Sequence, residues 1–454
     1  MTNNSSRIFM RSLKFFHYFA SICLFAYTWN LYTARNQINI PGRYDLFVYA
    51  LYAFLFYFLC RTYNAYLIGY SRTSDIIISL SLSSTISIIM VYVVTLIAWN
   101  KFHSPRCFLL LLLVQIFLNI IWSGLAVLLY FKLYEPLSTM IVYRSQNDLQ
   151  RLSDIYRFEK KYKVERYLEN PQSYQEIVEA LGNCKVLFLA GVDANIRNGV
   201  AKYCVENQIV GYFLPHVGDI IMMGGHHVQA FSVPLMSIQR TNGHPESMVA
   251  KRLFDILLSL LAILITSPLM LITAIAIRLQ DGGPALYRQT RLTKGGKTFS
   301  ILKFRSMVTD AEKDGVARLS CGESDDRITP IGKIIRAIRL DELPQLFNIL
   351  AGDMSFVGPR PERPEIAEQY TKIMPAFKLR LQVKAGLTGY AQIYGKYNTD
   401  PYDKLEMDLL YINKMSFMLD IQLLFATVRI LFKKESTSGI KQGDTTAIGS
   451  NKSE

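Results

Sequence analysis

Long apolar segments alternate with short polar stretches over the first 130 residues of the chain. Each of the four segments approaches or exceeds the ~20 residues that a helix needs to cross a bilayer. Tyr and Trp collect near the segment ends, and basic residues precede the first segment and follow the fourth, which favours both ends on the cytosolic side. We therefore predict a four-helix transmembrane bundle in residues 1–145, with helices at 15–32, 46–60, 76–99 and 107–130. No charge cluster marks a transport path through it, so anchoring is the simplest role.

The pattern changes between residues 146 and 245. A polar, helical stretch comes first, and an apolar run at 185–191 then predicts a buried strand, with a helix near 198–207 and strands at 209–214 and 228–235. Alternating strands and helices predict a central Rossmann-like α/β domain. The loop at 190–195 lacks the G-x-G-x-x-G spacing, so tight dinucleotide binding is not expected. His226 and His227 are adjacent, which is a poor spacing for a shared metal and ordinary for a loop.

A further apolar run, at 251–279, is long enough to span a membrane, but Ser267 and Pro268 lie in its middle. Proline removes a helical hydrogen bond, and the resulting kink allows the helix to enter and leave the membrane on one face. Lys251, Arg252 and Arg278 put basic residues at both ends of the run, which also favours one face. We predict a re-entrant membrane helix, with a complete crossing as the alternative.

The residues from 246 to 434 predict an α+β domain of short elements that includes this helix. Segments 285–292 and 298–307, joined by a Lys-Gly-Gly-Lys turn, predict a β-hairpin. Thr329 and Pro330 supply the cap and first position of a helix that ends near Arg339. Gly352 is predicted to end the next helix. The tail at 435–454 is polar and rich in small residues, and we predict that it is disordered.

Composition narrows the class of protein. Half of the 454 residues are hydrophobic, and the formal net charge of +14 suits an anionic membrane surface and phosphate-bearing substrates, with nucleic acid as the rival interpretation. The six cysteines are scattered without a C-x-x-C pair, which argues against disulfide and zinc frameworks.

Two adjacent carboxylates, Asp341 and Glu342, stand directly before Leu343 and Pro344. Proline is tolerated in a first helical turn, so we predict Asp341 as a helix N-cap, which by itself would be a structural role. The unpaired N–H groups and dipole of a helix N-terminus suit anions, and carboxylates meet phosphate there only if cations intervene. Arg339 and Arg360 are close in sequence, and a divalent metal could be recruited as well.

Further cations lie on the predicted hairpin. Arg291, Lys303 and Arg305 are candidate phosphate contacts, although each alone is more often a solvated surface charge. No histidine follows His244, so acid/base chemistry in the last part of the chain would rest on carboxylates, lysines or tyrosines.

Six motifs occur together and in order within residues 248–434. They are Lys251-Arg-Leu-Phe-Asp255, Ser267-Pro268, Lys303-Phe-Arg-Ser-Met307, Arg339-Leu-Asp-Glu-Leu-Pro-Gln345, Gly352-Asp-Met-Ser-Phe-Val-Gly-Pro-Arg-Pro361 and Gly386-Leu-Thr-Gly-Tyr-Ala-Gln392. With these motifs the chain resembles the bacterial sugar transferase family, the monotopic phosphoglycosyl transferases. The whole chain resembles the larger members, which start capsule or exopolysaccharide repeat units. One departure is Ala385, which precedes Gly386 where the family usually has proline; it bears on the rigidity of that turn and not on the chemistry.

The resemblance implies transfer of a sugar 1-phosphate from a UDP-sugar to undecaprenyl phosphate, with release of UMP. It implies a covalent aspartyl phosphosugar intermediate, Mg²⁺ as cofactor, Asp341 as nucleophile and metal ligand, and Glu342 as its acid/base or orienting partner. Arg360 would hold the diphosphate, in a substrate-binding set with Arg291, Lys303, Arg305 and Arg339. A hexose, glucose or galactose, is favoured by the resemblance alone, with an N-acetylated or diamino sugar as the alternative.

The implied location is the bacterial inner membrane, as a multi-pass protein with its catalytic domain on the cytosolic face. A homo-oligomer is left open, and a nucleic-acid partner is not expected. The main rival class is a binding or scaffold protein, which would have the same membrane segments but no need of Asp341 and Glu342 beside Arg360.

Overall fold

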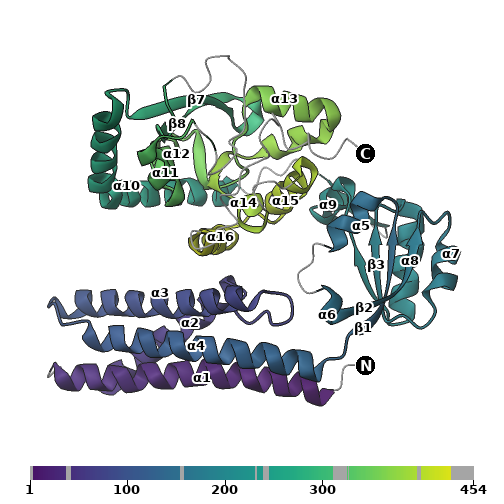
Figure 1. Cartoon of the computed structure of the whole chain (residues 1–454), viewed down its shortest axis with the longest axis horizontal. Helices are drawn as coiled ribbons and strands as arrows, with labels where there is room; N and C mark the ends of the chain where they lie inside the picture. The colour runs from purple at the N-terminus through teal and green to yellow at the C-terminus, as the bar shows by residue number, and fades with distance from the viewer. Residues whose placement is uncertain are drawn as a thin grey trace. The chain divides into compact units, whose positions relative to one another are not determined.

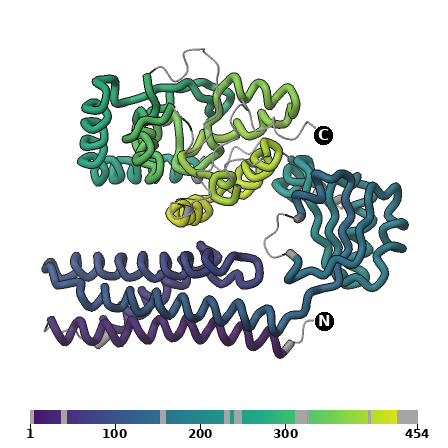
Figure 2. The backbone as a smooth tube through the Cα atoms, in the orientation of Figure 1, coloured from purple at the N-terminus to yellow at the C-terminus, as the bar shows by residue number. Residues whose placement is uncertain are grey.

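The structure is a computed structural model, and it describes residues 4–36, 42–153, 158–230, 233–238, 245–309, 325, 327–395 and 400–430. The chain divides into two compact units, Met1–Pro215 and His216–Glu454. Figures 1 and 2 trace the chain through both units. The tail predicted to be disordered, 435–454, lies outside the described residues.

Four long helices open the first unit, and each packs against two of the others. They are α1 (Asn4–Arg35), α2 (Gly42–Thr62), α3 (Thr73–Trp99) and α4 (Arg106–Leu133). Within the described residues, these four and α10 are the helices long and apolar enough to cross a membrane. The four predicted helices are therefore confirmed as helices, with longer bounds.

Polar side chains inside this helical group fix how the helices meet. His17 on α1 lies 2.9 Å from the Tyr66 hydroxyl through Nδ1, and 3.0 Å from Asn119 Oδ1 on α4 through Nε2. Tyr52 on α2 donates to Gln115 Oε1 on α4 at 3.0 Å. Hydrogen bonds between apolar helices specify their register, because a polar group that slips out of place loses its partner in lipid.

The rest of the first unit is a parallel sheet with helices on both faces. Its elements are β1 (Leu137–Tyr143), α5 (Gln146–Ser153), α6 (Phe158–Lys161), β2 (Tyr162–Glu169), α7 (Tyr174–Leu181), β3 (Val186–Ala190), α8 (Ala194–Glu206) and β4 (Val210–Phe213). The strand order is β2-β1-β3-β4, and every pairing is parallel. Helices α7 and α8 cover one face, and α5 covers the other. The strands predicted at 185–191 and 209–214 are confirmed.

Two parts of the α/β prediction are wrong. Strand β1 precedes the predicted boundary at residue 146, because its apolar run follows the fourth long helix too closely to stand out in the pattern. Residues 226–237 form an antiparallel hairpin, β5 (His226–Ala230) and β6 (Val233–Ser237), where one strand was expected at 228–235. This hairpin and α9 (Val217–Met223) belong to the second unit. The reason is packing: Ile220 of α9 lies in that unit's core, and Asn413 donates to its carbonyl at 2.5 Å.

Helix α10 (Pro245–Asp281) runs unbroken through Ser267 and Pro268. Pro268 has no N–H to donate to the Leu264 carbonyl, and the Ser267 hydroxyl donates to that carbonyl instead, at 3.0 Å. Figure 1 shows α10 as two limbs that meet at an angle, so the predicted kink is a bend within a continuous helix. Along it, Leu257 and Leu264 are 68% and 73% exposed, as expected for a lipid-facing side.

Most of the buried apolar side chains of the second unit form one large cluster, and short elements complete this unit. They are β7 (Leu286–Leu292), η1 (Lys294–Gly296), β8 (Thr298–Phe304), α11 (Pro330–Ala337), η3 (Leu340–Glu342), α12 (Gln345–Ala351), β9 (Met354–Val357), α13 (Pro364–Ile373), η4 (Pro375–Gln382), β10 (Ala385–Thr388), α14 (Tyr390–Tyr394), α15 (Pro401–Lys414) and α16 (Phe417–Ile430). The predicted hairpin is confirmed as the antiparallel pair β7–β8. Thr329 caps α11 by accepting from the Gly332 N–H at 3.0 Å, with Pro330 at the first turn, as predicted.

Both limbs of α10 pack on this unit. Arg252, on the first limb, donates to carbonyls at the C-terminal end of α12, Ile349 at 2.7 Å and Leu350 at 2.8 Å. Lys251 pairs with Asp420 of α16. Met270 and Ile277, on the second limb, contribute to a cluster with Phe304 and Ile335. Lys251 and Arg252, which suggested the membrane topology, therefore also hold the helix to the rest of the second unit.

Candidate active site

The two carboxylates lie in the single 3-10 turn η3 that connects α11 to α12. Arg339 opens the turn in the left-handed region, with φ 59°, which ends α11 and redirects the chain. The bonds that follow span three residues, from Leu343 N–H to the Leu340 carbonyl at 3.2 Å and from Leu346 N–H to the Leu343 carbonyl at 3.0 Å. The prediction that Asp341 is an N-cap is wrong, because the helical turn begins before it. Gly352, at φ 98°, ends α12 as predicted.

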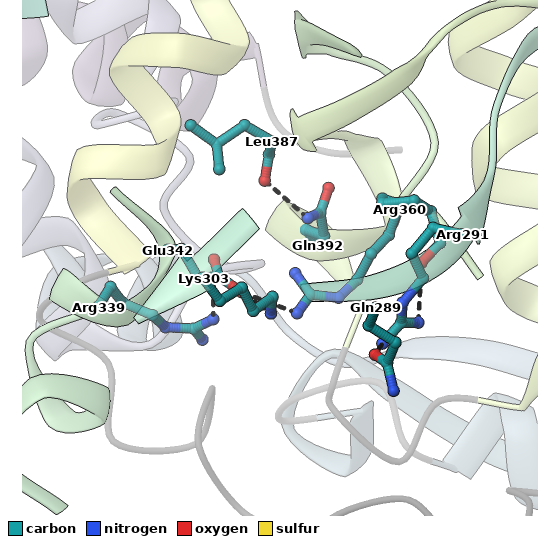
Figure 3. A network of polar contacts seen from close by, with 9 residues as sticks. Gln289, Arg291, Lys303, Arg339, Glu342, Arg360, Leu387 and Gln392 are labelled. Atoms are coloured by element: carbon teal, nitrogen blue, oxygen red, sulfur yellow. Dashed lines mark hydrogen bonds and ion pairs between the residues drawn. The ribbon is translucent and has the colours of Figure 1, made fainter. Parts of the chain in front are cut away.

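Three cations surround Glu342. Its Oε1 accepts from Lys303 Nζ at 3.1 Å and from an Arg360 guanidinium nitrogen at 2.9 Å, while Arg339 lies 4.0 Å from Oε2. Figure 3 shows these side chains converging from η3, β8 and the loop after β9. Glu342 is 13% exposed; burial raises its pKa, but the three cations outweigh burial and hold the pKa of this carboxyl far below its usual range.

Asp341 differs from its neighbour. No hydrogen bond to its carboxylate is present among the described residues, and the residue is only partly buried. Burial, followed by the charge of Glu342, raises the pKa of Asp341, although Lys303, Arg336 and Arg339 act in the opposite direction. Glu342 is thus bound by cations, whereas the carboxylate of Asp341 is available to a reactant.

Lys303 and Arg291 lie on the two strands of the β7–β8 hairpin. Burial lowers the pKa of Lys303, with Glu342 opposing that shift. Arg291 donates to the Pro361 carbonyl at 3.1 Å and to Gln289 Oε1 at 2.5 Å, and burial lowers its pKa to about 10. These contacts tie the hairpin to the Pro-Arg-Pro loop that carries Arg360 (Figure 3). The structure therefore gathers Lys303, Arg339 and Arg360 at the carboxylates, with Arg291 supporting the loop.

Arg305 is placed differently. Its guanidinium pairs with Asp281 at the C-terminal end of α10, and the side chain is 7% exposed. No contact of Arg305 with Asp341 or Glu342 is present in the described part of the chain. Its role as a substrate contact stays a prediction, and its observed contact anchors the end of the membrane helix.

Two close backbone approaches fix the position of Arg360. Strand β9 pairs in parallel with β10, and just beyond the end of β9 the Gly358 N–H donates to the Thr388 carbonyl and the Gly386 N–H to the Pro359 carbonyl, each at 2.9 Å. A Cβ at Gly358 or Gly386 would collide with backbone atoms of the other segment. Glycine is needed here for space, which explains both glycine motifs.

A buried ion-pair group supports the same loop, and it escaped the sequence reasoning. Arg380 is 4% exposed; it donates to Asp408 Oδ2 through Nε at 2.9 Å and to the Arg360 carbonyl at 3.0 Å. Glu362 lies 3.5 Å away on its other side. The spacing of residues gave no signal for this buried arginine, because its partners lie 20 and 28 residues away along the chain.

The site fits a Mg²⁺ ion that arrives with a substrate. No group of three His, Cys, Asp or Glu side chains gathers for a metal in the part of the chain that the structure describes. Mg²⁺ is nevertheless commonly held by one or two carboxylates together with substrate phosphates and water. Asp341, which has no hydrogen bond from its described neighbours, is the side chain suited to that role.

The region that carries these residues is similar to known proteins. Residues 246–434 match the model of the family described as bacterial sugar transferase. The chain is 39% identical over 191 residues to a UDP-glucose:undecaprenyl-phosphate glucose-1-phosphate transferase of Caulobacter vibrioides, in an alignment covering 41% of this chain and 71% of the relative. The chain belongs to the bacterial sugar transferase family.

Two further relatives show which part is shared. A UDP-N-acetylgalactosamine-undecaprenyl-phosphate N-acetylgalactosaminephosphotransferase of Aeromonas hydrophila is 43% identical over 184 residues, 40% of this chain and 43% of the relative. An uncharacterized sugar transferase of Bacillus subtilis is 40% identical over 195 residues, 43% of this chain and 92% of the relative. The chain matches half or less of the length of three relatives, the Aeromonas protein among them. It matches nearly all of the length of the Bacillus relative. The family assignment thus concerns the unit that carries Asp341 and Glu342.

Proposed function

We propose that this protein transfers a sugar 1-phosphate from a UDP-sugar to undecaprenyl phosphate and releases UMP, as the first membrane step of capsule or exopolysaccharide repeat-unit synthesis. The observation that carries this proposal is the pair in η3: Glu342 bound by Lys303 and Arg360, and Asp341 with its carboxylate uncommitted. The names of the family relatives support the substrate classes.

The first step uses Asp341 as nucleophile. One of its carboxylate oxygens attacks the phosphorus that carries the sugar, an acyl phosphate bond forms, and the bond to the UMP oxygen breaks. An ionised carboxylate is repelled by a diphosphate, so nearby cations must offset that repulsion. Lys303, Arg339 and Arg360 supply them. Asp341 would hold Mg²⁺, whose charge would help to offset that of the phosphates when it is bound.

The second step regenerates the enzyme. A phosphate oxygen of undecaprenyl phosphate attacks the same phosphorus, and the bond to Asp341 breaks. Two transfers through a covalent intermediate replace one difficult transfer that would need both substrates aligned at once. Glu342 is a poor proton acceptor, because its cations hold its pKa low. Its proposed role is to orient Lys303 and Arg360 toward the phosphates.

The membrane helix brings the lipid acceptor to this site. We propose that α10 enters and leaves the membrane on the cytosolic face, since both of its limbs pack on the same catalytic unit. The phosphate of the acceptor would then stay at the level of the headgroups, near Arg339 and Asp341, while its tail remains in lipid.

The decisive experiment withholds the acceptor. Purified full-length protein with UDP-sugar and Mg²⁺ alone should release about one equivalent of UMP and become labelled on Asp341, and undecaprenyl phosphate should discharge the label. A protein that releases no UMP until lipid is added would instead transfer directly in a ternary complex. A scaffold protein would release none in either case.

The same assay decides the sugar. A hexose, glucose or galactose, is the proposed donor, and N-acetylgalactosamine is the alternative that the name of the Aeromonas relative suggests. A panel of UDP-glucose, UDP-galactose and UDP-N-acetylgalactosamine, compared by the rate of UMP release, separates them.

A further inference from the structure

A small polar cavity lies at one edge of the parallel sheet in the first unit. Its volume is about 170 Å³. It is lined by Arg144, Asn170, Pro171, Gln172, Val192, Asp193 and Ile196. These residues come from the loops that follow β1, β2 and β3 and, for Ile196, from the first turn of α8. Because the three strands are parallel, their carboxyl ends bring these loops together at one edge.

The position of the cavity is the one where open α/β sheets bind ligands. From β1 the chain crosses to β2 on one side, and from β3 it crosses to β4 on the other side, so β1 and β3 are the neighbouring strands at which the direction reverses. The loops after two such strands diverge and leave a crevice between them. Arg144 follows β1 and Asp193 follows β3, so the cavity lies at this reversal point.

The cavity lining carries one positive and one negative side chain, and both are accessible to a ligand. Arg144 and Asp193 are 3.3 Å apart, with side chains 60% and 73% exposed. An ion pair so exposed contributes little to stability and can be exchanged for contacts to a ligand. Asp193 stands at the N-cap of α8 without using its side chain to cap it. The Arg144 guanidinium suits a phosphate, and the Asp193 carboxylate accepts hydrogen bonds from hydroxyl groups.

Size limits the ligand. The cavity is smaller than the ~300 Å³ at which pockets for drug-sized ligands begin. The loop at 190–195 also lacks the glycine spacing that dinucleotide sites use. A single phosphate with an attached sugar ring is therefore a better match than a dinucleotide.

We propose that this cavity binds a phosphate monoester that carries sugar hydroxyl groups, with Arg144 on the phosphate and Asp193 on the hydroxyls. A nucleoside monophosphate and a hexose 1-phosphate share that chemistry. The site is separate from Asp341 and Glu342, and it gives the α/β domain a ligand of its own.

The test uses the full-length protein with Arg360→Gln as background, which weakens phosphate binding at the carboxylate site. Glucose 1-phosphate, UMP and inorganic phosphate are titrated by calorimetry. Arg144→Gln should weaken the binding of both esters at least about tenfold, which corresponds to ~1.4 kcal/mol. Lys202→Gln, which removes an exposed charge from α8 outside the cavity, is the matched control and should leave binding unchanged.

Asp193→Asn tests the proposed contact to the hydroxyl groups separately from the contact between Arg144 and the phosphate. Removing this carboxylate should strengthen the binding of inorganic phosphate, because a repulsive charge is lost, and should reduce the preference for the esters over phosphate. The tighter-binding ester identifies the source of the ligand. Equal affinities in Arg144→Gln and Lys202→Gln, or no binding of either ester to the Arg360→Gln protein, would overturn the proposal.

Discussion

At the scale of single residues, two neighbouring carboxylates acquire opposite properties. Glu342 faces three cations and is held ionised, whereas Asp341 lacks hydrogen bonds from the described residues and is harder to ionise. Adjacent positions in a turn point in different directions, which is how one dipeptide can supply both an orienting group and a nucleophile.

Asp341→Asn should abolish labelling by UDP-sugar and also raise the melting temperature in detergent at pH 7. Folding raises the pKa of Asp341, so its ionised form opposes folding at neutral pH, and the neutral amide removes that opposition. The gain should shrink as the pH falls toward ~4, where both folded and unfolded chains protonate the aspartate. Scanning calorimetry at several pH values measures this gain in melting temperature. If Asp341→Asn melts below wild type at pH 7, folding does not raise the pKa of Asp341.

Glu342→Gln should reduce the rate of UMP release by ~10²–10³-fold, the loss typical when a group that organises charge stabilisation in the transition state is removed. It should also move the acidic limb of the pH–rate profile to lower pH, because the negative charge that raises the pKa of Asp341 is gone. The residual rate, measured from pH 4 to 8 against wild type, reports the shift. A limb displaced to higher pH would mean that Asp341 is not the titrating group.

Arg360→Lys should also be poor, since lysine keeps the charge but loses the planar fork that grips phosphate oxygens in pairs. The Michaelis constant for UDP-sugar should rise and the turnover should fall. Arg288→Lys is the matched control, because Arg288 is exposed on the same unit. Equal losses in both variants would point to a general effect of charge or stability.

At the scale of elements, the sequence predicted the features that interactions between nearby residues determine. The β7–β8 hairpin, the Thr329 cap and the Gly352 stop follow from turn and capping chemistry within a few residues. The 3-10 turn around Asp341 did not, because it depends on the left-handed Arg339 backbone, for which an arginine gives no signal. Strand β1 was hidden by the apolar helix before it. Among the site residues, Lys303, Arg339 and Arg360 were identified from sequence motifs, and the buried Arg380–Asp408 pair was not, because no motif marks it.

Pro268→Leu should restore the missing hydrogen bond to Leu264, straighten α10 and lower activity strongly. A straight helix would separate Met270 and Ile277 from the cluster with Phe304 and Ile335. A cysteine introduced in place of Lys297 reports topology: in intact cells it should be shielded from impermeant thiol reagents in an otherwise wild-type chain.

Leu271→Ala, at a position 63% exposed on the same helix, is the control and should keep both activity and shielding. Labelling of the cysteine from outside in the otherwise wild-type chain would contradict the re-entrant helix. If the cysteine at position 297 becomes labelled from outside only when Pro268→Leu is also present, that substitution has inverted the catalytic unit across the membrane.

At the scale of the whole molecule, the second unit has a core of its own, so it should act without the first. The domain bounds expected from the sequence place the start of a fragment at residue 246. The packing of α9 on α15 revises that boundary, because removing Ile220 leaves a gap in the core and Asn413 without its acceptor. A fragment of residues 216–454 in detergent should therefore release UMP at a rate near wild type and melt higher than the 246–454 fragment. If 216–454 folds but is inactive, the first unit takes part in catalysis.

The pairing of Lys251 with Asp420 also sets an order of events during synthesis. The lysine emerges first, and its partner follows 169 residues later. At ~5–20 residues per second that interval is roughly 10–30 seconds. During it, Lys251 lacks this partner, and the Arg360 loop lacks the support that Arg380 gives it when paired with Asp408. A ribosome that stalls before α15 would therefore leave a chain whose Arg360 loop lacks the support of Asp408.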